Sequence, residues 1–259
     1  MAKVIAVANQ KGGVGKTTTT VNLSACLAAA GRKVLVIDLD PQGNTTSGFG
    51  IDKEKLLNTS YELLLEDCRA SEAITELEDF SLDIIPASVD LAGAEVELVG
   101  VDNRESLLAK QISRQKGKYD FILIDCPPSL NILTINAFKA ADSILVPIQC
   151  EFYAMEGLTQ LINTINLVKQ RLNPKIEIEG ILFTMYDSRT NLCEQVVQEI
   201  TAFLPKKVYE TKIPRNVRLA EAPSFGLPIL YYDAASKGAA AYQDLATEFA
   251  ERIDKKAKK

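Results

Sequence analysis

The chain lacks the long hydrophobic runs and the paired cysteines that mark several classes of protein. No apolar run reaches the roughly 18 residues that a membrane-spanning helix needs, so no integral membrane association is expected. The opening residues, MAKVIAVANQ, do not have the layout of a signal peptide. The five cysteines are scattered, without a CxxC pair or the spacing of a metal site. Such cysteines indicate reduced thiols in a cytoplasmic protein.

The composition is that of an ordinary globular protein. Hydrophobic residues occupy 47% of the 259 positions and charged residues 24%, which is enough for a sizeable core. There is no low-complexity linker, no internal repeat and no clear domain boundary. We therefore predict one domain over residues 1–259, in which residues from about 254 to 259 form a basic tail.

Charge is distributed unevenly along the chain. The net charge is −5, which argues against a surface that is basic throughout. Residues 205–259 nevertheless hold 11 Lys and Arg against 7 Asp and Glu, whereas residues 1–204 hold 18 against 27. This asymmetry supports binding to nucleic acid or to an anionic membrane. A solvated last helix that ends in lysines explains it equally well.

Apolar runs alternate with amphipathic stretches, a pattern typical of α/β proteins. Strands are expected at Val4–Ala8, Lys33–Asp38, Leu82–Pro86, Asp120–Asp125, Ser143–Ile148, Gly180–Thr184 and Lys207–Tyr209. Helices are expected at Thr18–Ala30, Leu91–Val99, Arg104–Arg114, from near Leu130, and at Leu158–Leu172, Asn191–Phe203 and Ser236–Ile253, with a short helical insert within residues 52–80. Continuous apolar strands suit a parallel sheet that is covered on both faces. The prediction is a mainly parallel, twisted sheet of seven or eight strands with helices on both faces.

The stretch KVIAVANQKGGVGKTT, residues 3–18, is the most informative part of the chain. It places a glycine-rich turn between the first strand and the first helix, as in the phosphate-loop pattern G-x-x-x-x-G-K-[ST]. Gly15, Lys16 and Thr17 match the end of that pattern, but Gln10 occupies the place of its first glycine. A second lysine, Lys11, precedes the glycines. The pattern predicts a polyphosphate site with an unusual loop.

Each residue type in this loop suits polyphosphate chemistry. Gly12, Gly13 and Gly15 leave a row of backbone N–H groups open to an anion, and the helix N-terminus that follows also favours negative charge. Lys16 is expected to reach the β- and γ-phosphates, and the Thr17 hydroxyl to coordinate Mg²⁺. A glycine-rich surface turn without a ligand is the alternative.

Carboxylates follow two of the predicted strands. Asp38 and Asp40 lie at the end of the second strand, and Asp125 ends the segment DFILID. Ligands bind at the carboxyl ends of strands in such sheets, so these carboxylates are expected beside the phosphates, where Asp125 holds Mg²⁺. Capping of the next helix is the alternative role for Asp125. The segment QGNTTSGFG, residues 42–50, is expected to be a mobile loop that responds to the γ-phosphate.

Four motifs together carry a family resemblance. KGGVGKTT, DLDPQGN, ILIDCPPS and IPRNVRLAEAPSFG occur in the order and spacing of the ParA/Soj family of chromosome-partitioning ATPases, part of the deviant Walker A group that includes MinD. The resemblance covers the chain from Met1 to about Arg252. Because the sequence starts directly on the first strand, it resembles the short chromosomal type that lacks an N-terminal helix-turn-helix region.

The resemblance implies an ATP/ADP cycle with Mg²⁺ and a role for each site residue. Lys16 binds the phosphates of its own subunit, Lys11 crosses to those of the partner, and Asp40 positions or activates the attacking water. Thr17, Asp38 and Asp125 belong to the Mg²⁺ site. The implied nucleotide-binding residues are Lys11, Gly12, Gly13, Val14, Gly15, Lys16, Thr17 and Thr18 for the phosphates, and Met185, Pro214 and Asn216 near the adenine.

The resemblance also implies partners. The ATP-bound form is a homodimer that binds double-stranded DNA without sequence preference and is nucleoid-associated, and a basic N-terminal peptide of a ParB-type centromere-binding protein stimulates hydrolysis. The candidate DNA-binding residues are Arg189, Arg215, Arg218 and Lys237. Solvation alone is the alternative for any of these surface side chains, and Glu221 is placed to form an ion pair with Arg218 instead.

Two other readings share parts of the pattern. A MinD-like membrane-associated cell-division ATPase needs an amphipathic C-terminal helix, but no large apolar residue follows Ile253. An iron–sulfur ATPase that resembles the nitrogenase iron protein needs two ligand cysteines in each subunit. Cys126 and Cys150 are not in the glycine-flanked setting of that family, so buried reduced thiols are the preferred reading.

Overall fold

Short runs of buried aliphatic residues form the central strands, as expected for strands that are covered on both faces. The computed structural model describes residues 1–257. Its strands are β1 (Lys3–Val7), β2 (Val34–Asp38), β3 (Thr75–Leu77), β4 (Leu82–Ile85), β5 (Phe121–Asp125), β6 (Ser143–Gln149) and β7 (Glu177–Thr184). They form one seven-stranded sheet in the order β3-β4-β2-β5-β1-β6-β7, in which only the short edge strand β3 is antiparallel to its neighbour.

The register of the central strands brings the predicted carboxylates together. Asp38, the last residue of β2, pairs with Asp125, the last residue of β5, and Asp125 also pairs with Val7 at the end of β1. The glycine-rich turn follows β1 directly. The phosphate loop and two carboxylates therefore meet at one edge of the sheet, as the sequence predicts.

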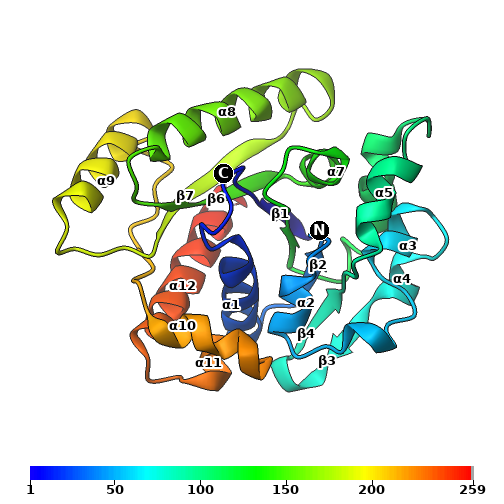
Figure 1. Cartoon of the computed structure of the whole chain (residues 1–259), viewed down its shortest axis with the longest axis horizontal. Helices are drawn as coiled ribbons and strands as arrows, with labels where there is room; N and C mark the ends of the chain where they lie inside the picture. Colours follow the sequence, from blue (N-terminus) through cyan, green and yellow to red (C-terminus); the bar gives the residue numbers. More distant parts are fainter. Residues whose placement is uncertain (258–259) are drawn as a thin grey trace.

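Helices cover both faces of the sheet (Figure 1). One layer holds α1 (Lys16–Ala29), α10 (Val217–Glu221), α11 (Ile229–Tyr232) and α12 (Lys237–Ala257). The other holds α3 (Ser60–Leu64), α4 (Ala70–Ala73), α5 (Leu91–Glu97), α6 (Leu107–Ile112), α7 (Ile132–Ala140), α8 (Ala154–Arg171) and α9 (Asn191–Phe203). Short 3₁₀ turns lie at Lys53–Lys55, Glu78–Phe80, Arg104–Ser106 and Ala222–Phe225. Each layer has its own core of aliphatic side chains against one face of the sheet, which confirms the predicted fold class.

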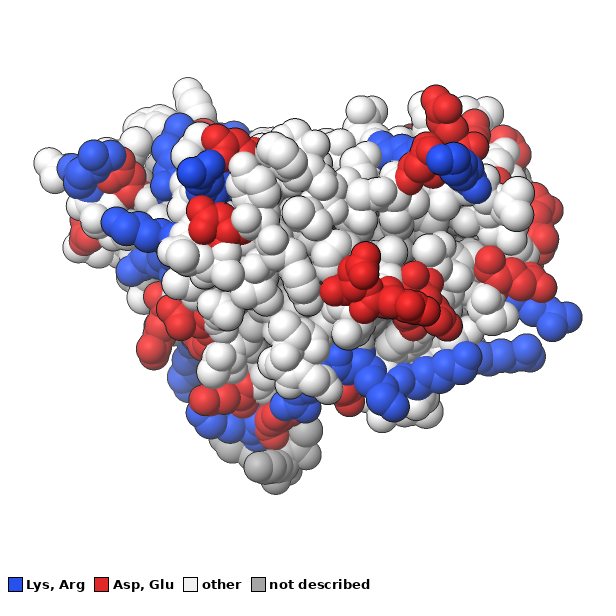
Figure 2. Space-filling view, turned by 90° about the horizontal axis from the view of Figure 1, so that it is seen from below, with Lys and Arg blue, Asp and Glu red and all other residues white. Residues whose placement is uncertain are grey.

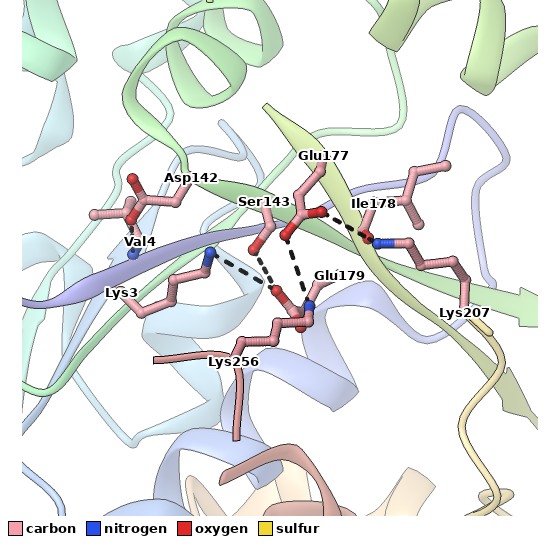
Figure 3. Close-up of polar contacts among 9 residues, drawn as sticks. All are labelled: Lys3, Val4, Asp142, Ser143, Glu177, Ile178, Glu179, Lys207 and Lys256. Atoms are coloured by element: carbon pink, nitrogen blue, oxygen red, sulfur yellow. Dashed lines mark hydrogen bonds and ion pairs between the residues drawn. The ribbon is translucent and has the colours of Figure 1, made fainter. Parts of the chain in front are cut away.

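The opposite edge of the sheet carries a buried ionic cluster that ties the two ends of the chain together (Figure 3). The Glu179 side chain of β7 is fully buried and accepts a hydrogen bond from the Ser143 hydroxyl at 2.8 Å. Lys256 of α12 pairs with Glu179 at 2.6 Å, and Lys3 of β1 lies 3.9 Å from the same carboxylate. Lys207 and Lys256 both pair with Glu177. This cluster fixes the end of α12 against β1 and β7.

Several local predictions are wrong or need new limits. Lys207–Tyr209 is not a strand of the sheet, since only an isolated bridge joins Val208 to Ile181. Helix α8 begins four residues before the predicted start, at Ala154, because Glu156 lies in its first turn and supports an earlier start. β7 begins three residues early, at Glu177. The insert within 52–80 contains the strand β3 as well as helices.

The described part of the predicted C-terminal tail is helical. Helix α12 continues through residues 254–257, where Lys255 and Lys256 form ion pairs with acidic side chains. The rest of the predicted basic tail, residues 258 and 259, lies outside the described residues. Within the part of the chain that the structure describes, no helix combines the length and the apolar character needed to cross a bilayer.

Candidate functional site

The glycine-rich turn has a backbone shape that only glycine adopts easily. Gly13 and Gly15 have positive φ angles of 73° and 85°, where any side chain adds strain. Gly15 then serves as the N-cap of α1, without a capping side chain. The first turn of α1 therefore keeps its N–H groups free of side-chain caps, in the arrangement that favours a bound phosphate.

Neighbouring strands hold the loop in place. Thr184 at the end of β7 donates a hydrogen bond to the Val14 carbonyl at 2.8 Å. The Asn9 amide donates to the Pro147 carbonyl at 2.8 Å, while its oxygen accepts from the Lys11 N–H at 3.0 Å. Gln10, at the place of the missing glycine, donates to the Thr164 hydroxyl on α8 at 3.2 Å. The departure from the common pattern thus ties the loop to α8.

The two lysines of the loop have different surroundings. Lys16 is buried, with 7% of its surface exposed, and its ammonium donates to the Lys11 carbonyl at 3.2 Å. Burial lowers the pKa of Lys16, and the nearby Asp125 carboxylate opposes that shift. Lys11 is half-exposed and forms an ion pair with Glu151 in the segment between β6 and α8. The Lys16 ammonium therefore contacts the loop itself, whereas the Lys11 side chain points away from the loop, toward Glu151.

Hydroxyl groups surround the two buried carboxylates at the strand ends. Asp125 accepts hydrogen bonds from Thr17 at 2.8 Å, Thr45 at 2.7 Å and Thr20 at 3.3 Å. Asp38 accepts from both the backbone N–H and the hydroxyl of Thr46, at 2.9 and 2.7 Å. Both carboxylates have no solvent exposure. The predicted partners Thr17, Asp38 and Asp125 are thus brought together.

Asp38 and Asp125 are two acids of like charge, unlike an ion pair in which the charges balance. Burial is the main factor that raises the pKa of both Asp38 and Asp125, and each carboxylate is also close to another acid. In the chain up to residue 257, no lysine or arginine forms an ion pair within 4 Å with either carboxylate. Two buried carboxylates with hydroxyl and amide donors are suited to a divalent cation, which would favour their ionised forms.

Asp40 lies two residues beyond Asp38 and is also largely buried, with 8% exposed. Its backbone N–H donates to Asp38 at 3.1 Å, and its carboxylate accepts from the Gln42 N–H at 2.9 Å. These bonds fix the turn that carries Asp40 from the end of β2. Its position beside the phosphate loop suits a group that orients water.

Thr45 and Thr46 are site residues that sequence reasoning did not single out. They lie in α2 (Asn44–Gly48), inside the segment expected to be a mobile loop, and both are buried. The prediction of a loop is therefore wrong for Asn44–Gly48. Bonds to Asp38 and Asp125 order the segment as a helical turn. The signal in the sequence is the pair of threonines just after the strand-end acids, because buried carboxylates need nearby donors.

A separate pocket lies beside the loop and has a volume of about 400 Å³. Gly15, Thr18, Thr184, Met185, Ile213, Pro214, Arg215, Asn216, Val217, Leu219, Ala220 and Tyr242 line it. The Tyr186 N–H donates to the Ile213 carbonyl and the Arg215 N–H to the Tyr186 carbonyl, which joins the segment around residue 185 to that around 214. The three residues predicted near the adenine thus line one pocket next to the phosphate loop.

The four predicted DNA-binding residues are exposed, and two of them, Arg189 and Arg218, are paired with acids. The Arg189 guanidinium donates two hydrogen bonds to Asp187, at 2.8 and 2.7 Å. Arg218 pairs with Glu221 at 2.8 Å and with Asp233 at 3.4 Å, so the ion pair considered from the sequence is present. Leu219 packs against Gly238, which places Arg218 and Lys237 on neighbouring segments. Arg215 lines the pocket described above.

Surface charge does not form one broad basic patch on the face in Figure 2. Lys and Arg side chains alternate there with Asp and Glu around a large uncharged centre. Association with a polyanion at this face would therefore need rearranged ion pairs or a second subunit.

The cysteines are buried thiols. All five are free and buried, and burial raises the pKa of Cys150 to about 12 and that of Cys126 well above its usual range. Between residues 1 and 257, no three His, Cys, Asp or Glu side chains are grouped as metal ligands. The burial and the raised pKa values indicate protonated thiols at Cys126 and Cys150.

Comparison with known proteins places this site in a family. Residues 2–178 match the family model described as an AAA domain. The chain is 54% identical over 250 residues to the sporulation initiation inhibitor protein Soj of Bacillus subtilis, covering 96% of this chain and 99% of that protein. It is 53% identical over 252 residues to the chromosome partitioning protein ParA of Myxococcus xanthus, covering 97% and 89%.

A solved structure is similar in fold and carries a nucleotide. The cobyrinic acid a,c-diamide synthase of Mycobacterium smegmatis, with a bound ATP analogue and magnesium, has a TM-score of 0.83 and 40% identity, covering 95% of this chain and 93% of that one. The Soj and ParA proteins above are more similar to this chain in sequence. The chain therefore belongs to the ParA/Soj family of chromosome-partitioning ATPases.

Proposed function

We propose that this protein binds ATP with Mg²⁺ and hydrolyses it in a cycle that drives chromosome or plasmid partitioning. The observation that carries the proposal is the meeting of Lys16, Thr17 and three carboxylates at one edge of the sheet, beside a pocket of about 400 Å³. The similar synthase binds an ATP analogue and magnesium, and the chain has the same fold.

The residues present fit a nucleotide–Mg²⁺ complex. The backbone from Lys11 to Thr18 would surround the phosphates, and Met185, Pro214 and Asn216 would contact the adenine. Thr17, Asp38 and Asp125 would hold Mg²⁺ directly or through water. The buried carboxylates favour a cation because their raised pKa reflects charge that the fold leaves uncompensated. Mg²⁺ would neutralise charge on the phosphates.

Hydrolysis needs a placed water and positive charge around the transferring phosphoryl group. Asp40 would orient or activate the water, and Lys16 would contact the β- and γ-phosphates of its own subunit. Lys11 would serve the partner's nucleotide. Its ion pair with Glu151 supports this assignment, since the side chain turns away from its own loop.

We further propose that the ATP-bound form is a homodimer that binds double-stranded DNA without sequence preference and that a ParB-type protein stimulates its hydrolysis. Arg189, Arg215, Arg218 and Lys237 from two subunits would form one basic strip, after exchange of the acidic partners of Arg189 and Arg218 for phosphates. Such a protein would act in the cytoplasm on the nucleoid.

The decisive experiment measures the ATPase rate with and without DNA and a ParB-type N-terminal peptide. The expected result is slow basal turnover and joint stimulation by the two partners. Asp40→Ala should retain DNA in an ATP-dependent manner, and Arg218→Glu should lose DNA binding with an unchanged basal rate. DNA binding of equal strength without nucleotide would contradict the proposal.

The MinD-like alternative is less well supported. Tyr242, Leu245 and Phe249 of α12 are buried in the core and are not available to lipid, and the lysines near its end pair with acids. Strong ATP-dependent sedimentation with anionic liposomes would favour that alternative.

A further inference from the structure

Helix α5 and the turns at its two ends carry two sets of apolar residues, of which the fold buries only one. Leu91, Ala94 and Leu98 are buried in the core, at a spacing that places them on one side of the helix. Val96, Val89 and Val99 are 74%, 73% and 68% exposed. Together with the exposed Ala92, these residues form a second stripe at positions 89, 92, 96 and 99. Within the helix, Ala92 and Val96 lie nearly opposite Leu91 and Ala94 at 100° per residue, and Val89 and Val99 extend this exposed side into the adjoining turns.

Acidic side chains border the exposed stripe on both sides. Asp90 and Glu97, seven residues apart, lie along one side of α5, and Glu95 lies along the other. Asp102 follows in the exposed turn beyond the helix. In Figure 1, α5 stands at one margin of the molecule beside α3. We name this surface the α5 stripe: Val89, Asp90, Ala92, Glu95, Val96, Glu97, Val99 and Asp102.

Resting on the proposed function, we propose that the α5 stripe is the docking site for a basic amphipathic segment, namely the basic N-terminal peptide of the partition partner. Four small apolar positions at helical spacing match the apolar side of a short helix, and the acids on both sides match basic side chains that border it. A basic amphipathic partner is therefore complementary to this surface in its apolar contacts and in its charge.

A second copy of the chain fits this surface poorly. A two-fold interface centred on the stripe would place acids against acids, because the same surface meets itself. Like charges across an interface oppose association. The basic excess of this chain lies in residues 205–259, so a contact between that region and the α5 stripe would join unlike surfaces and would not form a closed two-fold pair.

The position of the stripe explains why its occupant would be an activator. Val89 follows two residues after Ala87, whose N–H donates to the Thr46 hydroxyl at 2.9 Å. Thr46 in turn donates to Asp38. On the other side, Glu95 accepts a hydrogen bond from Asn131, the N-cap of α7 in the segment that follows Asp125. Both connections lead from α5 to the carboxylates of the candidate site.

The test measures binding of a fluorescent ParB-type N-terminal peptide to the whole protein by anisotropy, with ATP and DNA present. Val96→Ser combined with Val99→Ser should weaken binding about tenfold or more, since two apolar contacts are lost. Asp90→Lys combined with Asp102→Lys should weaken it further and remove most of its salt dependence. Leu167→Ser, at an exposed site on α8, is the matched control and should bind as the wild type does.

Two readouts separate this proposal from the proposed function. Basal and DNA-stimulated ATPase rates should be unchanged in all these variants, while peptide stimulation is lost in the α5 variants only. Hydrogen exchange of residues 89–101 should slow when the peptide binds. Wild-type affinity in both α5 variants would overturn the docking site and leave the partition ATPase intact. A wild-type protein that binds no peptide would overturn the docking site together with the proposed stimulation by a ParB-type protein.

Discussion

The two edges of the sheet both bury carboxylates, but they balance the charge in different ways. At the amino-terminal edge, Glu179 is satisfied within the fold by Ser143, Lys3 and Lys256. At the carboxyl-terminal edge, Asp38 and Asp125 receive only hydroxyl and N–H donors. The buried charge at the amino-terminal edge is balanced within the fold, whereas the carboxyl-terminal edge is arranged for a positively charged ligand.

This difference separates residues that stabilise the fold from residues that serve the ligand. Removing one partner of a buried ion pair is costly, because it leaves the other charge uncompensated. A buried charge without a counter-ion is instead a cost that the fold tolerates for function. Substitutions at the amino-terminal edge should therefore change stability, whereas substitutions at the carboxyl-terminal edge should change ligand binding or catalysis. Four experiments test this difference.

The largest effect is expected for Lys16→Ala. Loss of charge-assisted hydrogen bonds to two phosphates should weaken ATP binding about a hundredfold to a thousandfold. The thermal unfolding midpoint should not fall, because burial disfavours the charged lysine in the ligand-free protein. Nucleotide titration calorimetry and a thermal melt check both statements. Lys11→Ala is the control and should keep ATP binding while losing ATP-dependent dimerisation.

Asp40→Ala should have the next largest effect, on the chemical step. Loss of the group that orients or activates water should lower the hydrolysis rate by about 10²–10⁴-fold, with ATP affinity nearly unchanged. Single-turnover kinetics with labelled ATP separate the two quantities. A rate within a fewfold of the wild type would remove Asp40 from the catalytic role.

Much of the fold and the centre of the site follow from the sequence. Continuous apolar runs such as those around Val34 and Phe121 are typical of a parallel sheet that is covered on both faces. The glycines of the loop are explained by positive φ angles and by the close approach of an anion to the backbone. Asp38 and Asp125 were expected together because parallel strands that end in acids meet at one edge.

Other features depend on contacts between segments far apart in the chain. Glycine and threonine in residues 42–50 suggest a loop, but bonds from Thr45 and Thr46 to buried carboxylates order a helical turn there. Lys207–Tyr209 has strand composition, yet it makes only an isolated bridge beside β7. The pairing of Lys11 with Glu151, 140 residues away, has no local signal at all.

A matched pair of amide substitutions tests the comparison most directly. Glu179→Gln should lower the free energy of unfolding by about 1–2 kcal/mol, since two partly exposed lysines lose their carboxylate. Asp125→Asn should raise it by a similar amount in the absence of nucleotide, because it removes a buried charge that the fold leaves uncompensated. Urea unfolding at pH 7 without Mg²⁺ measures both. Equal destabilisation by the two substitutions would break the comparison.

The smallest effect is expected for Lys256→Ala at the end of α12. Its ammonium pairs with Glu177 and Glu179, but its side chain is 43% exposed, so solvent screens both interactions. Lys3 remains near Glu179 and limits the loss, so the unfolding free energy should fall by only about 0.5–1 kcal/mol. ATP affinity should be unchanged, because the cluster lies at the opposite edge of the sheet from the phosphate loop.

Urea unfolding and nucleotide titration of the same preparation provide the measurement, with Lys255→Ala as a control whose partner, Glu251, is an exposed neighbour on the same helix. A loss of ATP affinity in Lys256→Ala but not in Lys255→Ala would show that the two edges are coupled through α12, which packs along α1 behind the phosphate loop.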